Sequence, residues 1–171
     1  MYFQDESRFG LFTKNGRALT AKGVKPICPC HQVFQSTYLF GAFSPINGEH
    51  FLLELPECNT ECFELFISEF SKQKPDELIV IVLDNGAFHK AKKLQIPENI
   101  ILIFLPPYSP ELNPAEKIWA KFKRDFTNML FNDMDSLVDY ICQLVRNLSC
   151  DEVISITSFD YIFIDNYWTK I

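Results

Sequence analysis

Long hydrophobic runs are missing from this chain of 171 residues. The two longest, LIVIVL at 78–83 and IILIFL at 100–105, are far shorter than the roughly 20 apolar residues that span a bilayer. The first residues, MYFQDESRFG, also lack the basic start and the apolar stretch of a secretory signal. We therefore expect an intracellular protein with no membrane partner.

Several familiar site motifs are absent as well. The chain has no GxSxG elbow, no Walker-type glycine loop and no HExxH pair, so none of these sites is expected. Its six cysteines include CPCH at 28–31 and CNTEC at 58–62, which are not the CxxC pairs of a structural zinc module. Because a chain of this length builds a core without disulfides, we expect reduced, mostly packed thiols, with metal ligation as the weaker alternative.

A net positive charge is missing too, since the formal charge is −6. Residues 131–166 hold seven acids against one base, which leaves 15 acids and 15 bases in the rest of the chain. Within that neutral part, basic residues gather after two particular acids, Asp84 and Glu116; they are Lys90, Lys92 and Lys93, and then Lys117, Lys121, Lys123 and Arg124. Such a cluster is either a solvated face or a phosphate-binding surface.

Extended and helical patterns alternate along the chain. Apolar spacing predicts helices at 60–73, 113–126 and 134–148, and strands at 1–13, 33–44, 50–55, 78–83 and 100–105. The last two strands are apolar throughout, which is typical of a sheet covered on both faces. We expect one α/β domain, with a core at about 1–148 and a tail at 149–171 that is ambiguous between a strand and a short helix. Trp119, Phe122 and Phe126 follow at helical spacing and are predicted to lie in the core.

Three acids occupy positions where a sheet presents ligands or a helix begins. Asp84 follows a buried strand directly, at the end where α/β sheets bind ligands. Asp5 lies on an apolar strand face, and Glu116 falls in the first turn of a helix that Asn113 and Pro114 start. Each acid also has a purely structural interpretation. Asp84 can close an Asx turn, Asp5 can lie in water at a frayed terminus, and Glu116 can bond back to the N–H of Asn113.

Brought together, three carboxylates would form a hard-oxygen site. Mg²⁺ or Mn²⁺ suits such a site, because these ions take carboxylate and water oxygens and leave positions open for phosphate. Two ions about 3.5 to 4 Å apart activate an attacking oxygen and stabilise the leaving oxygen in phosphoryl transfer. That chemistry needs no nucleophilic side chain.

Three segments of the chain resemble a known family. YFQDESRFG, IVLDNGAFHK and LPPYSPELNPAEKIWAKFK resemble the catalytic blocks of DDE transposases of bacterial insertion sequences, in the mariner-related superfamily. The order agrees, with 78 residues between Asp5 and Asp84 and 31 between Asp84 and Glu116. The resemblance reaches from the first residues to about Asn147, and the proline-rich third block is the most specific of the three.

The resemblance implies an RNase H-like fold, with a mixed five-stranded sheet flanked by helices on both faces. It implies that Asp5, Asp84 and Glu116 are catalytic and hold two Mg²⁺ or Mn²⁺ ions. These would cut DNA at transposon ends and join the freed 3′-hydroxyl to target DNA, in a homodimer or larger assembly on DNA in the bacterial nucleoid. The further predicted DNA contacts are His89, Lys90, Tyr108, Lys117, Lys121 and Arg124, although Tyr108 can equally anchor its loop by packing.

The sequence also departs from that family. Its helix-turn-helix DNA-binding modules are not seen here, so we expect residues 1–171 to be the catalytic domain alone. The spacing of 31 residues between the second and third acids is slightly short. The alternative hypothesis is therefore a non-catalytic transposase remnant that acts as an oligomerisation or regulatory partner.

Overall fold

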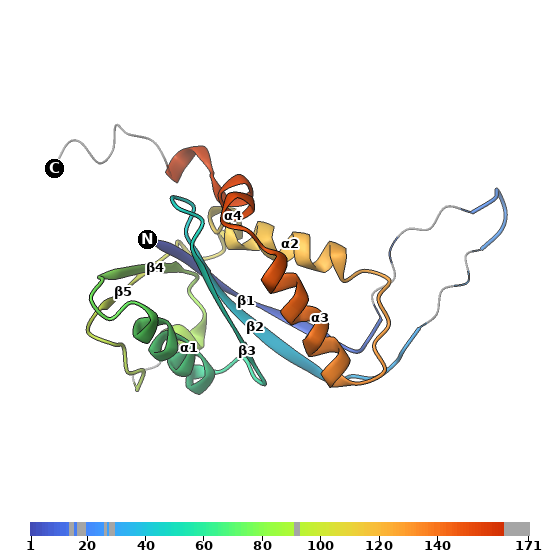
Figure 1. Ribbon diagram of the computed structural model, residues 1–171, viewed down its shortest axis with the longest axis horizontal. Helices are drawn as coiled ribbons and strands as arrows, with labels where there is room; N and C mark the ends of the chain where they lie inside the picture. The colour runs from blue at the N-terminus through green and yellow to red at the C-terminus, as the bar shows by residue number, and fades with distance from the viewer. Residues whose placement is uncertain (14–15, 17–19, 26, 28–29, 91–92, 163–171) are drawn as a thin grey trace.

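A single mixed sheet forms the centre of the molecule (Figure 1). The computed structural model describes residues 1–13, 16, 20–25, 27, 30–90 and 93–162. The five strands are β1 (Tyr2–Gly10), β2 (Ser36–Phe43), β3 (His50–Leu55), β4 (Ile79–Leu83) and β5 (Ile100–Phe104). They lie in the order β3-β2-β1-β4-β5, with β1, β2 and β3 antiparallel and β1, β4 and β5 parallel. All five predicted strands are confirmed.

The first strand ends earlier than predicted, at Gly10, and the second begins later, at Ser36. Beyond β1 and β2 the two segments still meet, because the Leu11 N–H donates to the Gln35 carbonyl at 3.0 Å and the Thr13 N–H to the His31 carbonyl at 3.1 Å. The two donors are two residues apart but the two acceptors are four residues apart, so these bonds do not keep the register of the β1–β2 ladder. The regular strands therefore stop at Gly10 and Ser36.

Helices cover both faces of the sheet, as predicted. One face is covered by α1 (Thr60–Gln73), and the other by α2 (Ala115–Asp125), α3 (Met134–Asn147) and α4 (Cys150–Thr157) (Figure 1). Short 3₁₀ turns lie at Ala87–Lys90, Pro110–Leu112 and Asp160–Ile162. The ambiguous segment after Asp151 is helical. None of the helices in the described part of the chain is long and apolar enough to cross a membrane.

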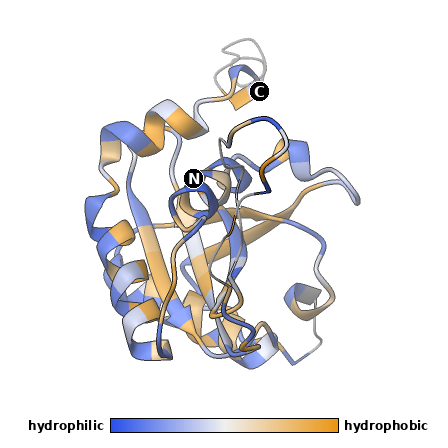
Figure 2. Ribbon diagram, turned by 90° about the vertical axis from the view of Figure 1, so that its right-hand side faces the viewer, coloured by the Kyte–Doolittle hydropathy of each residue, from blue (hydrophilic) through white to orange (hydrophobic). Residues whose placement is uncertain are grey.

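Two hydrophobic cores result from the alternation of side chains along the strands. In β2, Leu39 and Phe43 face α2, whereas Phe40 and Ala42 face α1. Figure 2 shows the same pattern as hydrophobic strands under helices that alternate between hydrophobic and hydrophilic bands. The predicted core positions are confirmed; Trp119, Phe122 and Phe126 are all buried against the sheet. Each fully buried Phe stabilises the fold by about 1.5–3 kcal/mol.

Helix α2 approaches the sheet closely at Gly41. A β-carbon added to Gly41 would lie 2.8 Å from Cη2 of Trp119 and 2.7 Å from the Phe43 ring. A glycine is needed at this position because there is no room for a side chain between β2 and α2. This close packing sets the position of α2 over β1 and β2.

The cysteines differ from the expectation. Among the described cysteines, Cys30, Cys142 and Cys150 are exposed, and Cys58 and Cys62 are half-buried; none of these five is in a disulfide. The prediction of mostly packed thiols is therefore wrong for the described part of the chain, since three of the five lie on loop or helix surfaces. Cys28 lies outside the described residues.

Candidate active site

Asn113 anchors the start of α2 to the central strand. Its side chain is buried, donating from Nδ2 to the Gln4 carbonyl of β1 at 2.9 Å and accepting from the Ala115 N–H at 3.2 Å. Pro114, the residue directly before α2, already has helical angles, whereas Asn113 is extended. The capping predicted for Asn113 is thus confirmed. The proline-rich loop that precedes it also makes a short 3₁₀ turn, at Pro110–Leu112.

Glu116 does not complete the cap. The N–H of Asn113 donates instead to the Pro110 carbonyl at 2.9 Å, so it is not available to a carboxylate. Glu116 itself is exposed in the first turn of α2. The structural alternative for Glu116, a bond back to the Asn113 N–H, is therefore wrong in this conformation.

Asp84 lies just beyond the end of β4, with 59% of its side chain exposed. Its Oδ1 accepts from the Gly86 N–H at 2.9 Å, so the Asx turn expected as the structural interpretation is present. The turn uses one carboxylate oxygen. The other oxygen remains able to bind a ligand.

Asp5 lies in the middle of β1, opposite Gly41 of β2. The pKa of its carboxyl is raised to about 8, first by burial and then by the negative charges of Glu6, Glu116 and Asp84, against a lowering by a backbone hydrogen bond from Glu6. The frayed, solvated position that was the alternative for Asp5 is therefore wrong. A pKa raised this far indicates that no neighbouring positive charge among the described residues stabilises the ionised carboxylate of Asp5.

The three acids line one cavity of about 390 Å³. Asp5 comes from β1, Asp84 from the end of β4 and Glu116 from α2, and the proline-rich loop, residues 105–110, also lines the cavity. Within the described residues, no three His, Cys, Asp or Glu side chains are close enough to hold one ion in this conformation. The cavity is therefore lined by three carboxylates whose negative charges repel one another. In this conformation their oxygens do not surround a single ion position.

The predicted DNA contact His89 is buried in this conformation. Its side chain is only 1% exposed and packs on the rings of Phe63 and Phe88, with centroids 4.4 and 4.1 Å away. Nε2 lies 3.0 Å from Glu6 Oε1, and Nδ1 lies 3.0 Å from Asp84 Oδ1. In this conformation the ring is enclosed by aromatic groups and carboxylates, so a phosphate contact by His89 stays a prediction.

Lys121 forms ion pairs within the protein. Its Nζ lies 3.1 Å from Asp125 and 3.4 Å from Glu152, so it links α2 to α4, and its DNA contact stays a prediction. Lys117 is exposed beside Glu116, and Arg124 is 76% exposed with its Nε 3.8 Å from Asp125. The side chain of Lys90 lies outside the described part of the molecule.

Tyr108 is fully exposed on the rim of the cavity. It has a φ of 59°, a left-handed conformation that is uncommon for a bulky residue. The packing alternative for Tyr108 is wrong, since its ring is in solvent. Its place in the cavity wall agrees with the other alternative, a wall of the substrate groove.

Glu6 is the site residue that the sequence reasoning missed. It lies next to Asp5 but on the opposite face of β1, where its Oε1 accepts from Gln4 Nε2 at 2.7 Å and contacts His89. The signal was present as two successive acids in a strand-like segment. Strand alternation alone places one of them on each face.

Comparison with known proteins identifies the family. Residues 1–138 match the family described as DDE superfamily endonuclease, and the chain belongs to that family. It is also 42% identical over 108 residues to the uncharacterized protein y4pE/y4sA of Sinorhizobium fredii, a match that covers 61% of this chain and 79% of the relative.

The fold is similar to that of the Mos1 mariner transposase. The structure superposes on the Mos1 paired-end complex with left transposon end at a TM-score of 0.70 and 13% identity. The Mos1 paired-end complexes with Mn and with Mg give TM-scores of 0.70 and 0.66, each at 14% identity. Each match covers 92% of this chain and 51% of the Mos1 chain for the left-end, Mn and Mg complexes. The chain thus spans about half the length of these transposases, and the predicted RNase H-like architecture is confirmed.

Proposed function

We propose that this chain is a transposase catalytic domain, which carries out divalent-metal-dependent cleavage of DNA phosphodiester bonds and strand transfer. The observation that carries the proposal is the cavity in which Asp5, Asp84 and Glu116 meet from three separate elements of a DDE-family fold. We infer that these three residues are the catalytic acids. The proposal extends to the chain's partners, namely transposon-end and target DNA, bound by a homodimer or larger assembly in the bacterial nucleoid.

The three acids fit Mg²⁺ or Mn²⁺. All of their donor atoms are carboxylate oxygens, which these ions prefer, and the charge that raises the pKa of Asp5 is charge that a cation offsets. When bound, two such ions supply the charge that activates an attacking oxygen and stabilises a leaving one. The Mos1 complexes with Mn and Mg support the same choice of ions.

The chain's own residues would hold and orient these groups. Asp5 is supported by the sheet, and Asp84 by its Asx turn, so both carboxylates have limited freedom. Glu116 is exposed at the start of α2 without a cap bond, so it can turn into the cavity when DNA and metal arrive. We therefore expect Glu116 to be the most mobile of the three acids in the metal-free protein.

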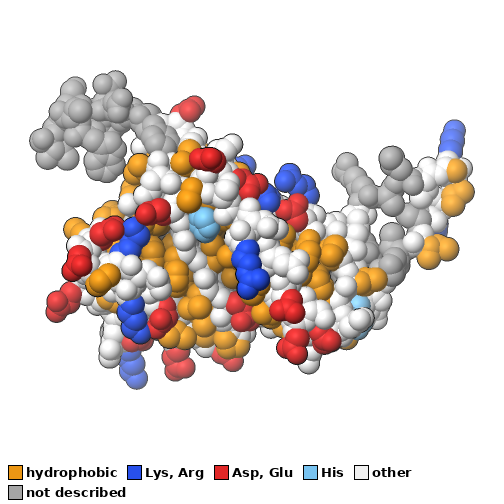
Figure 3. All heavy atoms as spheres, viewed as in Figure 1, with side chains coloured by type: hydrophobic (Ala, Val, Ile, Leu, Met, Phe, Trp, Pro, Cys, Tyr) orange, Lys and Arg blue, Asp and Glu red, His pale blue; other side chains and the backbone are white. Residues whose placement is uncertain are grey.

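DNA would be held by a few individual cations. On the face drawn in Figure 3, acidic and basic side chains are interspersed. The exposed Lys117 and Arg124 on α2 and the exposed Tyr108 ring are the contacts that we propose among the described residues. Lys117 and Arg124 suit phosphates, and Tyr108 offers a stacking surface to a base.

Cleavage in the presence of Mn²⁺ tests the proposal. DNA that bears the transposon ends should be nicked by the wild-type chain and not by Asp84→Ala, since loss of that carboxylate removes a ligand that the reaction requires. Asp76→Ala, an exposed acid outside the cavity, is the matched control and should nick like wild type. Equal cleavage by the wild type and Asp84→Ala would contradict the assignment, and no cleavage by either protein would favour the non-catalytic remnant.

A further substitution tests the role of Tyr108. Tyr108→Gly removes the ring and relieves a left-handed conformation that costs a non-glycine residue about 1–2 kcal/mol. We expect single-stranded DNA to bind several-fold more weakly, while the melting temperature stays equal or rises. Unchanged DNA affinity, measured by fluorescence anisotropy, would exclude Tyr108 from the substrate groove.

A further inference from the structure

A buried polar cluster lies behind the candidate active site, on the α1 side of the sheet. Glu6 has only 8% of its side chain exposed, and its Oε1 accepts from Gln4 Nε2 at 2.7 Å and lies 3.0 Å from His89 Nε2. Two buried groups thus hold one carboxylate oxygen. Since Gln4 and Glu6 both belong to β1, the sheet holds the Nε2 side of the imidazole in place.

The rest of the His89 ring has little freedom. It is packed between Phe63 of α1 and Phe88, and the His89 backbone N–H donates to the Gly86 carbonyl at 3.1 Å. The Phe88 carbonyl in turn accepts from the Thr60 hydroxyl at 3.3 Å. With Nε2 on Glu6 and two phenyl rings in contact with the imidazole, the direction of Nδ1 is determined.

Nδ1 is directed at a catalytic acid. It lies 3.0 Å from Asp84 Oδ1, although the angles there do not yet make a hydrogen bond, and it has no hydrogen-bond partner among the described residues. A buried ring nitrogen without a partner is costly. A small turn of the exposed Asp84 carboxylate would complete the bond.

Gly86 leaves the space for this contact. A β-carbon added there would lie 3.0 Å from His89 Nδ1 and 3.1 Å from Asp84 Oδ1. The Gly86 N–H also donates to the same Oδ1 at 2.9 Å. The Gly86 N–H and the His89 Nδ1 therefore both lie close to the same oxygen of Asp84, Oδ1.

We propose that His89, with both ring nitrogens protonated, is a positioning residue for Asp84: Nε2 donates to Glu6 Oε1 and Nδ1 donates to Asp84 Oδ1. This inference rests on the proposed function, in which Asp84 is a metal ligand. The role differs from the DNA contact that the sequence predicted. It also gives Glu6 a purpose, since an acid inside an apolar layer is otherwise unfavourable. Groups that orient a metal ligand in this way commonly contribute 10- to 100-fold to metal affinity.

Two isosteric variants separate the two ring nitrogens. In His89→Asn, the side-chain amide nitrogen takes the place of Nδ1 and can still donate to Asp84. In His89→Gln, the amide nitrogen takes the place of Nε2 and can bond only to Glu6. His50→Gln is the matched control, because His50 is a half-buried histidine whose Nδ1 lies 2.9 Å from the Gly48 carbonyl, outside the cavity.

Mn²⁺ binding by calorimetry is the first measurement. We expect the dissociation constant to rise about 10-fold or more for His89→Gln, and to stay within about 3-fold of wild type for His89→Asn and His50→Gln. Wild-type affinity in His89→Gln would overturn the proposal. Equal losses in both His89 variants, with equally lowered melting temperatures, would also overturn it, because they would show a purely packing role.

A metal-free measurement keeps the inference separate from the proposed function. The ¹³C resonance of the Asp84 carboxyl should shift in His89→Gln and stay near its wild-type position in His89→Asn. No shift in either variant would overturn the positioning role even if the wild type binds Mn²⁺ and cuts DNA. Conversely, a wild-type chain that neither binds Mn²⁺ nor cuts DNA would overturn the proposed function, while the resonance would still decide whether His89 holds Asp84.

Discussion

Asp5 is a carboxylic acid in an unfavourable place. Burial and three neighbouring acids raise its pKa to about 8 from an ordinary value of 3.8. Between about pH 4 and pH 8 the folded state therefore binds more protons at this residue than the unfolded state. By linkage, the contribution of Asp5 to stability is complete below pH 4 and is lost as the pH rises towards 8.

Substitution of Asp5 tests this electrostatic cost. Asp5→Asn keeps the size of the side chain and removes the titration, so it should raise the melting temperature of the metal-free protein at pH 8 by roughly 5 °C. The difference from wild type should shrink as the pH falls to 4. Scanning calorimetry across this range measures it, and a difference that does not vary with pH would contradict the assigned cause.

Sequence reasoning reached the three acids but not their neighbours. Asp84 and Glu116 could be predicted because the features that mark them, a strand end and a capped helix start, are local in the chain. The burial of His89 could not, since it depends on Phe63 of α1 and on Glu6, which is 83 residues away. Long-range packing therefore determines the surroundings of His89, and the motif alone does not show them.

Among the elements, α2 matters most to the site because it carries Glu116. Asn113 links its start to β1, because its side chain donates to the Gln4 carbonyl of β1 and accepts from the Ala115 N–H of α2. Gly41 lets the middle of α2 approach β2. The position of Glu116 relative to Asp5 is therefore set by sheet and helix packing, and the proline-rich loop only leads the chain to that point.

Removal of the Asn113 side chain should loosen this helix. Asn113→Ala leaves the buried Gln4 carbonyl and the Ala115 N–H without these partners, so we expect the free energy of unfolding to fall by about 2–3 kcal/mol. Urea denaturation measures the change. The exposed Asn132 provides the control, because Asn132→Ala should change stability by less than about 0.5 kcal/mol. Equal effects of the two substitutions would show that Asn113 does not anchor α2.

The boundaries of most elements could be predicted, and α4 shows why one could not. Its eight residues, CDEVISIT, are rich in β-branched types that favour strands. The deciding signal was at its start, where Ser149 accepts from the Glu152 N–H at 3.2 Å, as a serine three residues before a glutamate often does. In so short a segment, the cap outweighed the intrinsic preference.

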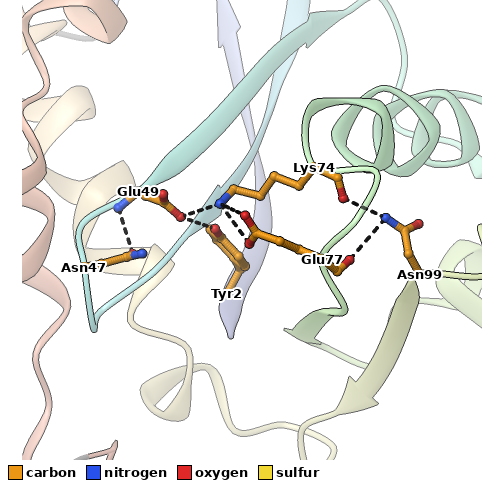
Figure 4. A network of polar contacts seen from close by, with 6 residues as sticks. All are labelled: Tyr2, Asn47, Glu49, Lys74, Glu77 and Asn99. Atoms are coloured by element: carbon orange, nitrogen blue, oxygen red, sulfur yellow. Dashed lines mark hydrogen bonds and ion pairs between the residues drawn. The ribbon is translucent and has the colours of Figure 1, made fainter.

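At the scale of the whole molecule, an ionic network joins distant parts of the chain. Figure 4 shows Lys74, at the end of α1, with its Nζ 2.8 Å from Glu49 and 3.1 Å from Glu77. The hydrogen bond from Lys74 lowers the pKa of Glu49 to about 2, with help from Tyr2. Burial, together with Glu49, raises the pKa of Tyr2 to about 12. The first strand, the turn before β3 and α1 are thereby connected.

Loss of Lys74 should weaken this connection modestly. The side chains of Glu49 and Glu77 are 42% and 63% exposed, so solvent screens both pairs, and Lys74→Met should lower the free energy of unfolding by about 1 kcal/mol. Because the pKa of Glu49 is lowered, this contribution is present above about pH 4.5 and is lost as the pH falls towards 2. Lys72→Met is the control, since Lys72 has a single exposed pair with Glu69. A difference between the two variants that persists at pH 2 would contradict the ionic origin.

The layered α/β architecture could be predicted because it follows from apolar periodicity. The distribution of free positive charge could not, because it depends on how helices meet. Lys121 looked like a phosphate ligand on an isolated helix, yet α4 brings Glu152 to within 3.4 Å of it. A row of basic residues on one helix therefore does not by itself predict DNA binding, because acids on a neighbouring helix can pair with them.

The central claim is that Asp5, Asp84 and Glu116 hold the ions that cut DNA. Anomalous diffraction from crystals of the chain grown with Mn²⁺ and a transposon-end duplex tests it most directly. The account predicts two Mn²⁺ peaks about 3.5–4 Å apart in the cavity, with carboxylate oxygens of all three acids as ligands. Mn²⁺ bound only at other acids, such as Glu49 and Glu77, or absent from the cavity while DNA occupies it, would contradict the claim.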